Sequence, residues 1–306
     1  MDDLNFSDAM LVRVEGTAAN STQGAQAAAP SALYNPGLAL DFFRSSGTVE
    51  QIQKGRPFFK QDDKSGGLFS SGVKMYLLLD GEVGMMLNDK FFGIVRQGEI
   101  FGELAVIAEL PRSASAMAIT DCRVISVDRK QFQAALRKTP EFALMLMGLM
   151  TQRLRKSMTS LAGKAPLAAN VSMERGRVFN KGMLAQLAKE LGSQLVLPAK
   201  AGTAVINTGA VAAFMYIVHE GCVEISIGTQ VVELVGSGGF FGEMALLDNA
   251  PRSAAATAKT DCSLLSIGRN DFLELVKEKP EFSATLLKSI AVRMQHLTQQ
   301  VAKLPG

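Results

Sequence analysis

The sequence predicts a mainly β protein with flanking helices, built as two tandem β-roll (jelly-roll) domains that each end in a long C-terminal helix. The first observation is a repeat at a fixed offset of 140 residues, which aligns Met75 with Met215 and Arg153 with Arg293. A repeat of this length indicates two copies of one domain, and 306 residues suffice for two domains. The second observation is that short apolar segments separated by turn residues precede the helical end of each copy, as in rolls and barrels.

The domain boundaries follow from this repeat. Residues 1–35 form an N-terminal segment expected to be partly disordered, because residues 16–31 are rich in Ala, Ser, Thr, Gln and Gly. The first domain is predicted over residues 36–161, a linker over 162–181 and the second domain over 182–306. Each domain is expected to open with a short helix, over 36–46 and over 182–191.

Turn residues mark the strands within each copy. Residues 75–79 and 82–87 flank Asp80-Gly81, and the second copy has Glu220-Gly221 at the same place. An acidic residue followed by Gly between apolar runs predicts a β-hairpin. The first copy is seven residues longer between its opening turn and the following strand, and the excess is expected in the Gly/Ser-rich loop at 65–72.

Two helices are expected at the end of each copy. The first covers residues 128–138 or 269–279 and is stopped by Pro140 or Pro280, which then begin the longer second helix. Along the long helices a stripe follows 3–4–3–4 spacing, which suits packing on the parent barrel and pairing between helices equally. The stripe consists of Leu144, Met147, Thr151, Leu154, Met158 and Leu161, and of Ala284, Leu287, Ala291, Met294, Thr298 and Val301.

The candidate functional site is a cassette that occurs in both copies. Phe101-Gly102-Glu103-Leu104 is followed by Pro111-Arg112-Ser113-Ala114, and Phe241-Gly242-Glu243-Met244 is followed by Pro251-Arg252-Ser253-Ala254. The residues after the Gly are expected to form one helical turn, whose free N–H groups favour an anion. The Arg suits two phosphate oxygens at once, and the carboxylate can accept hydrogen bonds from hydroxyls. Phosphate plus sugar is the simplest ligand.

The alternative is an ion pair between the Glu and the Arg of each cassette. Recurrence of the pair with the same flanks, inside apolar sequence where charges need a polar partner, favours a ligand.

The cassette resembles the phosphate-binding cassette of cyclic nucleotide-binding domains, which occur in bacterial catabolite activator proteins and in regulatory subunits of cyclic-AMP-dependent protein kinase. The resemblance covers about residues 48–160 and 193–304. It implies that Glu103 and Glu243 bind the ribose 2′-hydroxyl and that Arg112 and Arg252 bind the cyclic phosphate. Further expected contacts, by resemblance, are Ser113, Ala114, Ser253 and Ala254 beside the phosphate, and Ser157 and Thr298 over the purine.

Composition argues against other classes of function. The net charge of +3 is too small to indicate nucleic acid as the main partner, and we expect no helix-turn-helix after the long helix. Only two histidines are present and they are not repeat equivalents, so no metal site is expected. No nucleophile motif indicates an enzyme. Cys122 and Cys262 are repeat equivalents expected to be buried thiols.

The sequence also bears on the compartment and on the partners of the protein. The Met-Asp-Asp start lacks the features of a signal peptide, and the longest apolar run, residues 142–150, is too short to cross a bilayer. We therefore expect a cytoplasmic sensor that binds cyclic AMP or cyclic GMP in two cassettes, needs no cofactor, and signals to an unknown protein partner through its long helices. The alternative is a scaffold that uses the fold for assembly. The long helices could pair within one chain as a pseudo-dimer, pair between chains as a homodimer, or remain in a tandem arrangement.

The basic run Arg153-Leu154-Arg155-Lys156 is interpreted as a solvated helix face.

Overall fold

The computed structural model describes residues 34–63, 72–162, 173–175, 178–192 and 196–301, except the side chains of 156–162, 173–175 and 297–301. The chain forms two compact units, of which the first contains residues 1–157 and 286–306 and the second residues 158–285. Most of the last long helix, from residue 286 onward, thus groups with the first repeat. The N-terminal segment up to residue 33, including the stretch at 16–31, and nearly all of the predicted loop at 65–72 lie outside the described residues.

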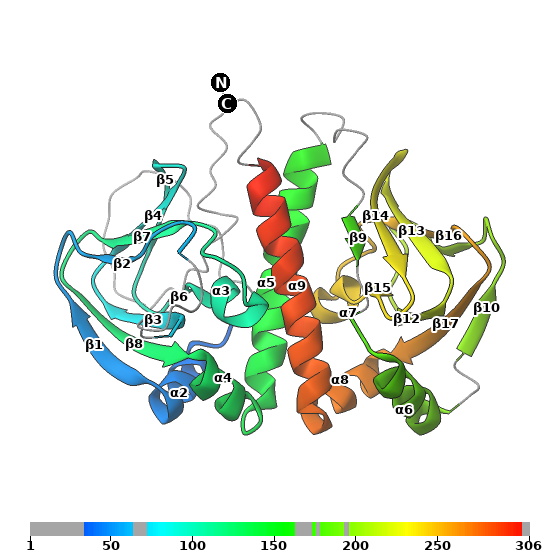
Figure 1. Ribbon diagram of the computed structural model, residues 1–306, viewed down its shortest axis with the longest axis horizontal. Coiled ribbons are helices and arrows are strands. Elements are labelled where there is room, and N and C mark those ends of the chain that lie inside the picture. Colours follow the sequence, from blue (N-terminus) through cyan, green and yellow to red (C-terminus); the bar gives the residue numbers. More distant parts are fainter. Residues whose placement is uncertain (1–33, 64–71, 163–172, 176–177, 193–195, 302–306) are drawn as a thin grey trace. The chain divides into compact units, whose positions relative to one another are not determined.

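Unit 1 contains a pair of four-stranded antiparallel sheets (Figure 1). The first sheet has the order β1-β8-β3-β6 and the second the order β2-β7-β4-β5. The strands are β1 (Thr48–Ile52), β2 (Pro57–Phe59), β3 (Lys74–Asp80), β4 (Val83–Leu87), β5 (Lys90–Val95), β6 (Ile100–Phe101), β7 (Ser115–Ala118) and β8 (Cys122–Asp128). The helices of this repeat are α2 (Pro36–Ser46), α3 (Glu103–Ala108), α4 (Arg129–Leu136) and α5 (Pro140–Ala162).

Unit 2 repeats this topology. Its sheets have the orders β10-β17-β12-β15 and β11-β16-β13-β14-β9. The strands are β9 (Met173–Arg175), β10 (Val196–Ala199), β11 (Ala204–Ile206), β12 (Phe214–Glu220), β13 (Cys222–Ile227), β14 (Gln230–Gly236), β15 (Phe240–Phe241), β16 (Ala255–Ala258) and β17 (Cys262–Gly268). The helices of the second repeat are α6 (Lys181–Leu191), α7 (Met244–Asp248), α8 (Arg269–Glu278) and α9 (Pro280–Val301), the last of which continues into unit 1. The predicted pair of rolls, each ending in a long helix, is confirmed.

The predicted hairpin at Asp80-Gly81 is wrong. Strand β3 pairs with β6 and β8, whereas β4 pairs with β5 and β7, so this turn carries the chain from one sheet to the other. Glu220-Gly221 does the same between β12 and β13. The hairpin lies one strand later, between β4 and β5, where Asn88 and Asp89 have φ of 49° and 59°. Two successive residues at positive φ suit the twist of a two-residue hairpin.

The predicted linker also contains structure. Within it, β9 adds to the edge of β14 in parallel register, so three residues of that segment extend a sheet of unit 2. The lead-in helices form where expected because Asn35 and Asn180 accept hydrogen bonds from the amides of Leu38 and Met183 and thereby cap α2 and α6.

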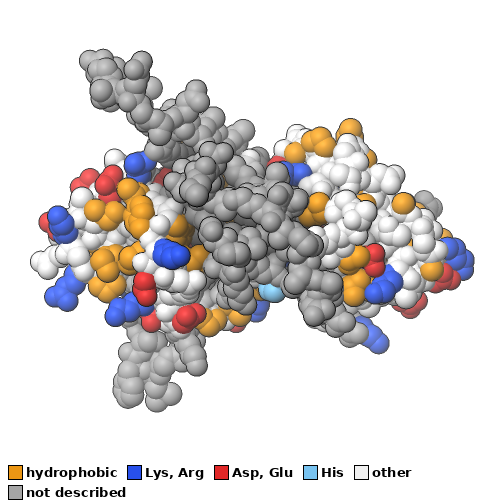
Figure 2. Space-filling model, turned by 90° about the horizontal axis from the view of Figure 1, so that it is seen from above, with side chains coloured by type: hydrophobic (Ala, Val, Ile, Leu, Met, Phe, Trp, Pro, Cys, Tyr) orange, Lys and Arg blue, Asp and Glu red, His pale blue; other side chains and the backbone are white. Residues whose placement is uncertain are grey.

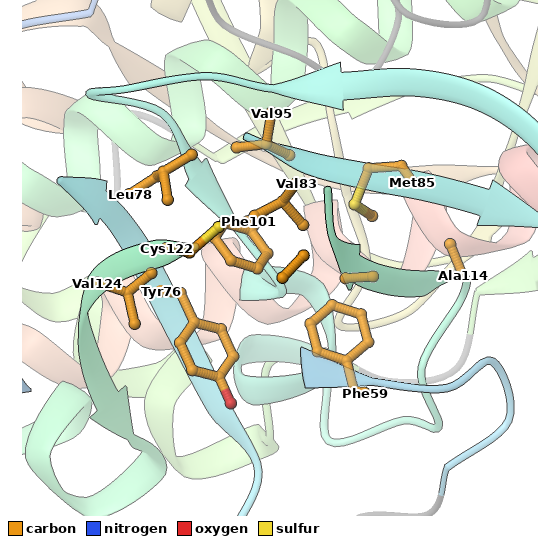
Figure 3. Close-up of a cluster of buried hydrophobic side chains, with 12 residues drawn as sticks. Phe59, Tyr76, Leu78, Val83, Met85, Val95, Phe101, Ala114, Cys122 and Val124 are labelled. Atoms are coloured by element: carbon orange, nitrogen blue, oxygen red, sulfur yellow. The ribbon is translucent and has the colours of Figure 1, made fainter. Parts of the chain in front are cut away.

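The core of the first roll lies between its two sheets and is shown in Figure 3. Tyr76 and Phe101 stack with ring centroids 5.1 Å apart, and Phe59 adjoins both rings. The buried thiol of Cys122 packs in the same cluster, and Cys262 belongs to the corresponding cluster of unit 2, as predicted. Because Phe101 belongs to this core, burial of apolar surface fixes strand β6, which leads into the cassette.

Candidate functional site: a pocket around the repeated cassette

The Gly of each cassette adopts a backbone conformation that other residues avoid. Strand β6 leads into Gly102, whose φ is +73°, and α3 begins at the next residue. A Cβ at Gly102 would lie 2.9 Å from Nη1 of Arg112, and one at Gly242, where φ is +81°, would lie 2.8 Å from Nη1 of Arg252. Glycine is therefore required both by the turn and by the close approach of the guanidinium. Among the described residues no side chain caps the start of α3, so the amides of its first turn can face an anion.

Backbone carbonyls fix the guanidinium group of each cassette Arg. Arg112 donates from Nη1 to the carbonyl of Gly102 at 2.8 Å and from Nη2 to the carbonyl of Lys74 at 2.7 Å. Arg252 donates in the same way to the carbonyls of Gly242 and Phe214, each at 2.5 Å. The Arg112 guanidinium also lies 3.9 Å from the ring centroid of Phe59. Two of the donors are therefore already bound to carbonyls, and the rest of the fork can receive a ligand.

Burial also affects the acidity of these groups. It lowers the pKa of Arg112 to about 10, although Tyr76, Glu103 and Asp63 act in the opposite direction. Burial likewise lowers the pKa of Arg252. At neutral pH Arg112 remains a cation in a partly dry setting, where a phosphate contact is stronger than in water.

The ion pair considered in the sequence analysis does not form in the first cassette. Within the described residues Glu103 pairs with Arg153 of α5, Nη1 to Oε1 at 2.8 Å, and only 8% of each side chain is exposed. The interpretation of residues 153–156 as a solvated face is therefore wrong for Arg153, because α5 turns this side chain toward the buried carboxylate. Glu243 is buried like Glu103, and the repeat offset places Arg293 at the position equivalent to Arg153.

Residues of the first cassette line a small hollow of about 30 Å³ that is partly open to solvent. This volume is below the usual range for small-ligand pockets. The structure brings together every predicted residue of the first cassette. The lining also includes Arg153 and apolar side chains that the sequence did not single out as site residues. The full lining is Phe59, Met85, Val95, Ile100, Phe101, Gly102, Glu103, Leu104, Ala105, Arg112, Ser113, Ala114 and Arg153.

The second cassette has the same local arrangement. Phe241 belongs to the core, Gly242 and Arg252 make the matching hydrogen bond, and Ser253 and Ala254 follow the Arg directly. Met244 begins the short helix α7. The side chains of Ser157 and Thr298 lie outside the described residues, so their contact with the purine stays a prediction.

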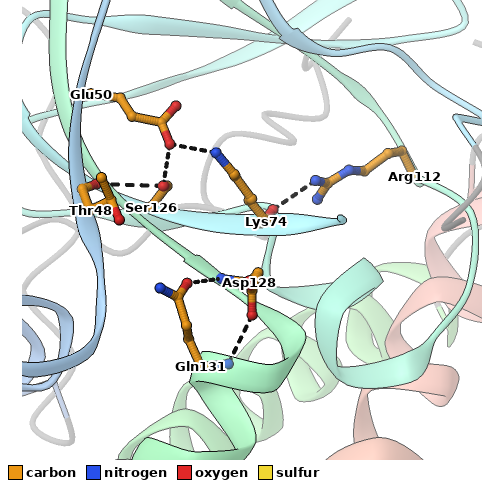
Figure 4. A network of polar contacts seen from close by, with 7 residues as sticks. All are labelled: Thr48, Glu50, Lys74, Arg112, Ser126, Asp128 and Gln131. Carbon is orange, nitrogen blue, oxygen red and sulfur yellow. Dashed lines mark hydrogen bonds and ion pairs between the residues drawn. The ribbon is translucent and has the colours of Figure 1, made fainter. Parts of the chain in front are cut away.

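A polar network supports strand β3, whose Lys74 carbonyl accepts a hydrogen bond from Arg112 (Figure 4). Lys74 offers its carbonyl to Arg112 while its ammonium pairs with Glu50 at 2.6 Å. The hydroxyl of Ser126 donates to the same carboxylate. Burial alone raises the pKa of Glu50, but the bonds from Lys74 and Ser126 outweigh it and hold that pKa below its ordinary value. The backbone that accepts Arg112 is thus tied to two neighbouring strands.

Within unit 1, residues from α9 contact the segment between α3 and Arg112. Gln295 is buried and donates from Nε2 to the carbonyl of Pro111 at 2.8 Å. The ammonium of Lys288 pairs with Glu109 at 3.3 Å. The cassette of the first repeat therefore touches the last helix of the second, a contact that repeat spacing alone does not indicate.

Comparison with known families identifies the fold. The model of the family described as "Cyclic nucleotide-binding domain" matches residues 49–139 and 196–279, more than half of the chain. The chain belongs to this family. Both matches include a complete cassette, so the chain carries two cyclic nucleotide-binding domains.

Several proteins are similar to this chain. A "cAMP-dependent protein kinase regulatory subunit" of Eremothecium gossypii is 29% identical over 226 residues, which are 74% of this chain and 43% of that protein. A "cGMP-dependent protein kinase" of Toxoplasma gondii is 26% identical over 228 residues, 74% of this chain and 21% of that protein. The Thermus thermophilus catabolite activator protein has a TM-score of 0.37 at 28% identity, over 42% of this chain and 59% of that structure. The chain thus spans less than half the length of these two curated relatives.

The described residues contain no group of three or more His, Cys, Asp or Glu side chains that could hold a metal ion. No described helix is long and apolar enough to cross a membrane. On the face seen in Figure 2, side chains of both charge signs are interspersed.

Proposed function

We propose that this chain is a non-catalytic cytoplasmic sensor that binds one cyclic nucleotide in each cassette and passes occupancy to a protein partner. The observation that carries the proposal is the pair of cassette arginines, Arg112 and Arg252. Equivalent backbone carbonyls fix the guanidinium group of each, and each cassette also contains a carboxylate. A scaffold that had no ligand would gain nothing from a desolvated guanidinium, because burial of a cation costs free energy.

Each group has a chemical task in this proposal. The guanidinium of Arg112 and the amides at the start of α3 bind the cyclic phosphate, and the carboxylate of Glu103 accepts a hydrogen bond from the ribose 2′-hydroxyl. Arg153 holds that carboxylate in place through the buried ion pair. Ser113 and Ala114 leave room beside the phosphate. Glu243, Arg252, Ser253 and Ala254 do the same in the second copy.

Cyclic AMP is the proposed ligand. The Arg-Ser-Ala sequence of both cassettes resembles that of cyclic-AMP-binding bacterial proteins, and regulatory subunits named for cyclic-AMP-dependent kinase are among the similar proteins. Cyclic GMP is the alternative, since a hydroxyl at Ser113 or Ser253 can bond guanine and the similar proteins include cGMP-dependent kinases.

The long helices are the proposed route to the partner. The contacts of Gln295 with Pro111 and of Lys288 with Glu109 connect α9 to the segment that carries Arg112. A shift of that segment on ligand binding changes these contacts with α9, so the occupancy of the first cassette and the position of α9 are linked. Relatives named as kinase regulatory subunits support a protein kinase as the class of partner.

Isothermal titration calorimetry of the full chain tests the binding. We expect two equivalents of cyclic AMP per chain, with Arg112→Ala abolishing or greatly weakening the first site and Arg252→Ala the second. Each loss is on the order of 2–3 kcal/mol or more, as for a charge-assisted contact. Asp41→Asn, an exposed change on α2, serves as the control and leaves both sites intact. Absence of heat and of thermal stabilisation with either cyclic nucleotide would favour the scaffold alternative.

A further inference from the structure

The two cassettes differ in the loop segment that pairs with the backbone of the phosphate arginine. In the first copy, the amide of Arg112 donates to the carbonyl of Asp63 at 3.1 Å, and the amide of Asp62 donates to the carbonyl of Arg112 at 2.9 Å. In the second copy, the corresponding bonds join Arg252 to Ala210 at 3.0 Å and Gly209 to Arg252 at 2.8 Å. Identical pairing therefore places an acidic dipeptide beside one arginine and an uncharged one beside the other.

The acidic segment is held in a defined position. The carboxylate of Asp63 accepts the amide of Lys60 at 2.8 Å, and the amide of Gln61 donates to the hydroxyl of Ser115 on β7 at 2.8 Å. Gln61 is also bonded through its side chain to Asn88. These bonds tie the segment to β7 and to the turn between β4 and β5, so the backbone of Asp63 is held beside that of Arg112.

A fixed carboxylate near a phosphate site repels the ligand that the site binds. Among the described residues, the charges of Asp63 and Glu103 act on the Arg112 guanidinium, and the charge of Glu243 acts on the Arg252 guanidinium. Asp63 is exposed, so water and salt screen its charge, and the effect belongs to the range of exposed charge pairs.

We propose that Asp63 is an affinity-determining residue which makes the first cassette the weaker of the two for a cyclic nucleotide phosphate. This inference rests on the proposed function, since it ranks two sites for the same anionic ligand. It predicts that the second site fills first, and that the difference between the sites narrows as ionic strength rises.

The test measures each site alone in the full-length chain, using cyclic AMP as the probe. Arg252→Ala isolates the first site and Arg112→Ala isolates the second. In the first background, Asp63→Asn keeps an oxygen acceptor for the Lys60 amide but removes the charge, and we expect affinity to rise roughly two- to fivefold at low salt. In the second background, Ala210→Asp should lower affinity by a similar factor, and at high salt both changes should shrink.

Asp41→Asn removes another exposed carboxylate, from α2 of the same unit, and should change the affinity of the first site by less than Asp63→Asn does. An unchanged or weaker first site in Asp63→Asn, with cyclic AMP still binding, overturns the proposal while leaving the proposed function intact. Equal gains in Asp63→Asn and Asp41→Asn also overturn it, because the effect would then come from net charge alone. If the unmodified chain binds no cyclic nucleotide, the proposed function itself has failed.

Discussion

Replacing Arg153 with Met removes one partner of the buried ion pair beneath the first cassette. The pair is short at 2.8 Å, and only 8% of each side chain is exposed, so Glu103 would keep a charge with little water around it. Removing one partner of such a pair costs about 3–5 kcal/mol. For a domain of this size we expect the unfolding temperature of the first roll to fall by on the order of 10 °C.

The assay is thermal and urea unfolding, analysed with separate transitions because two rolls need not unfold together. Arg96→Ala is a control in the same roll, since the Arg96–Glu82 pair is longer at 3.8 Å with side chains 45% and 43% exposed; it should cost about 0–1 kcal/mol. The double variant Arg153→Met with Glu103→Gln should recover much of the lost stability, since no charge is then stranded. If Arg153→Met costs no more than Arg96→Ala, the reasoning about the buried charge is refuted.

Two further predictions concern the same region. Gly102→Ala should destabilise the first roll by about 1–3 kcal/mol and weaken its ligand site, because φ is +73° and the added Cβ would meet the Arg112 guanidinium at 2.9 Å. Gly72→Ala is the control, since nothing lies within 4 Å of a Cβ placed there. Equal unfolding temperatures of the two variants would contradict the argument. Because the pKa of Glu50 is lowered in the folded state, its ion pair with Lys74 stabilises the fold fully above the ordinary Glu pKa of about 4.3, and this stabilisation is lost as pH falls through the lower folded pKa. Lys74→Met should flatten this part of the acid unfolding curve. An unchanged curve would show that the pair contributes nothing to stability.

Local chemistry in the sequence determined a large part of this protein. The repeat offset, the apolar runs and the prolines at 140 and 280 predicted two rolls with long terminal helices, because strand alternation and helix termination depend on nearby residues. The cassette residues could be predicted for the same reason: Gly102, Glu103 and Arg112 lie within one short segment, and their types already indicate an anion site.

The tertiary structure decided which distant groups meet that cassette. Asp80-Gly81 has the composition of a hairpin turn, yet its flanking strands pair with β8 and β7, partners supplied by later parts of the chain. The basic run at 153–156 looked solvated because helix periodicity does not reveal where a buried carboxylate lies. The contrast between Asp63 and Ala210 became meaningful only when the backbone bonds placed each residue beside an arginine. Such contacts join residues far apart in sequence, and packing of the whole roll selects them rather than local propensity.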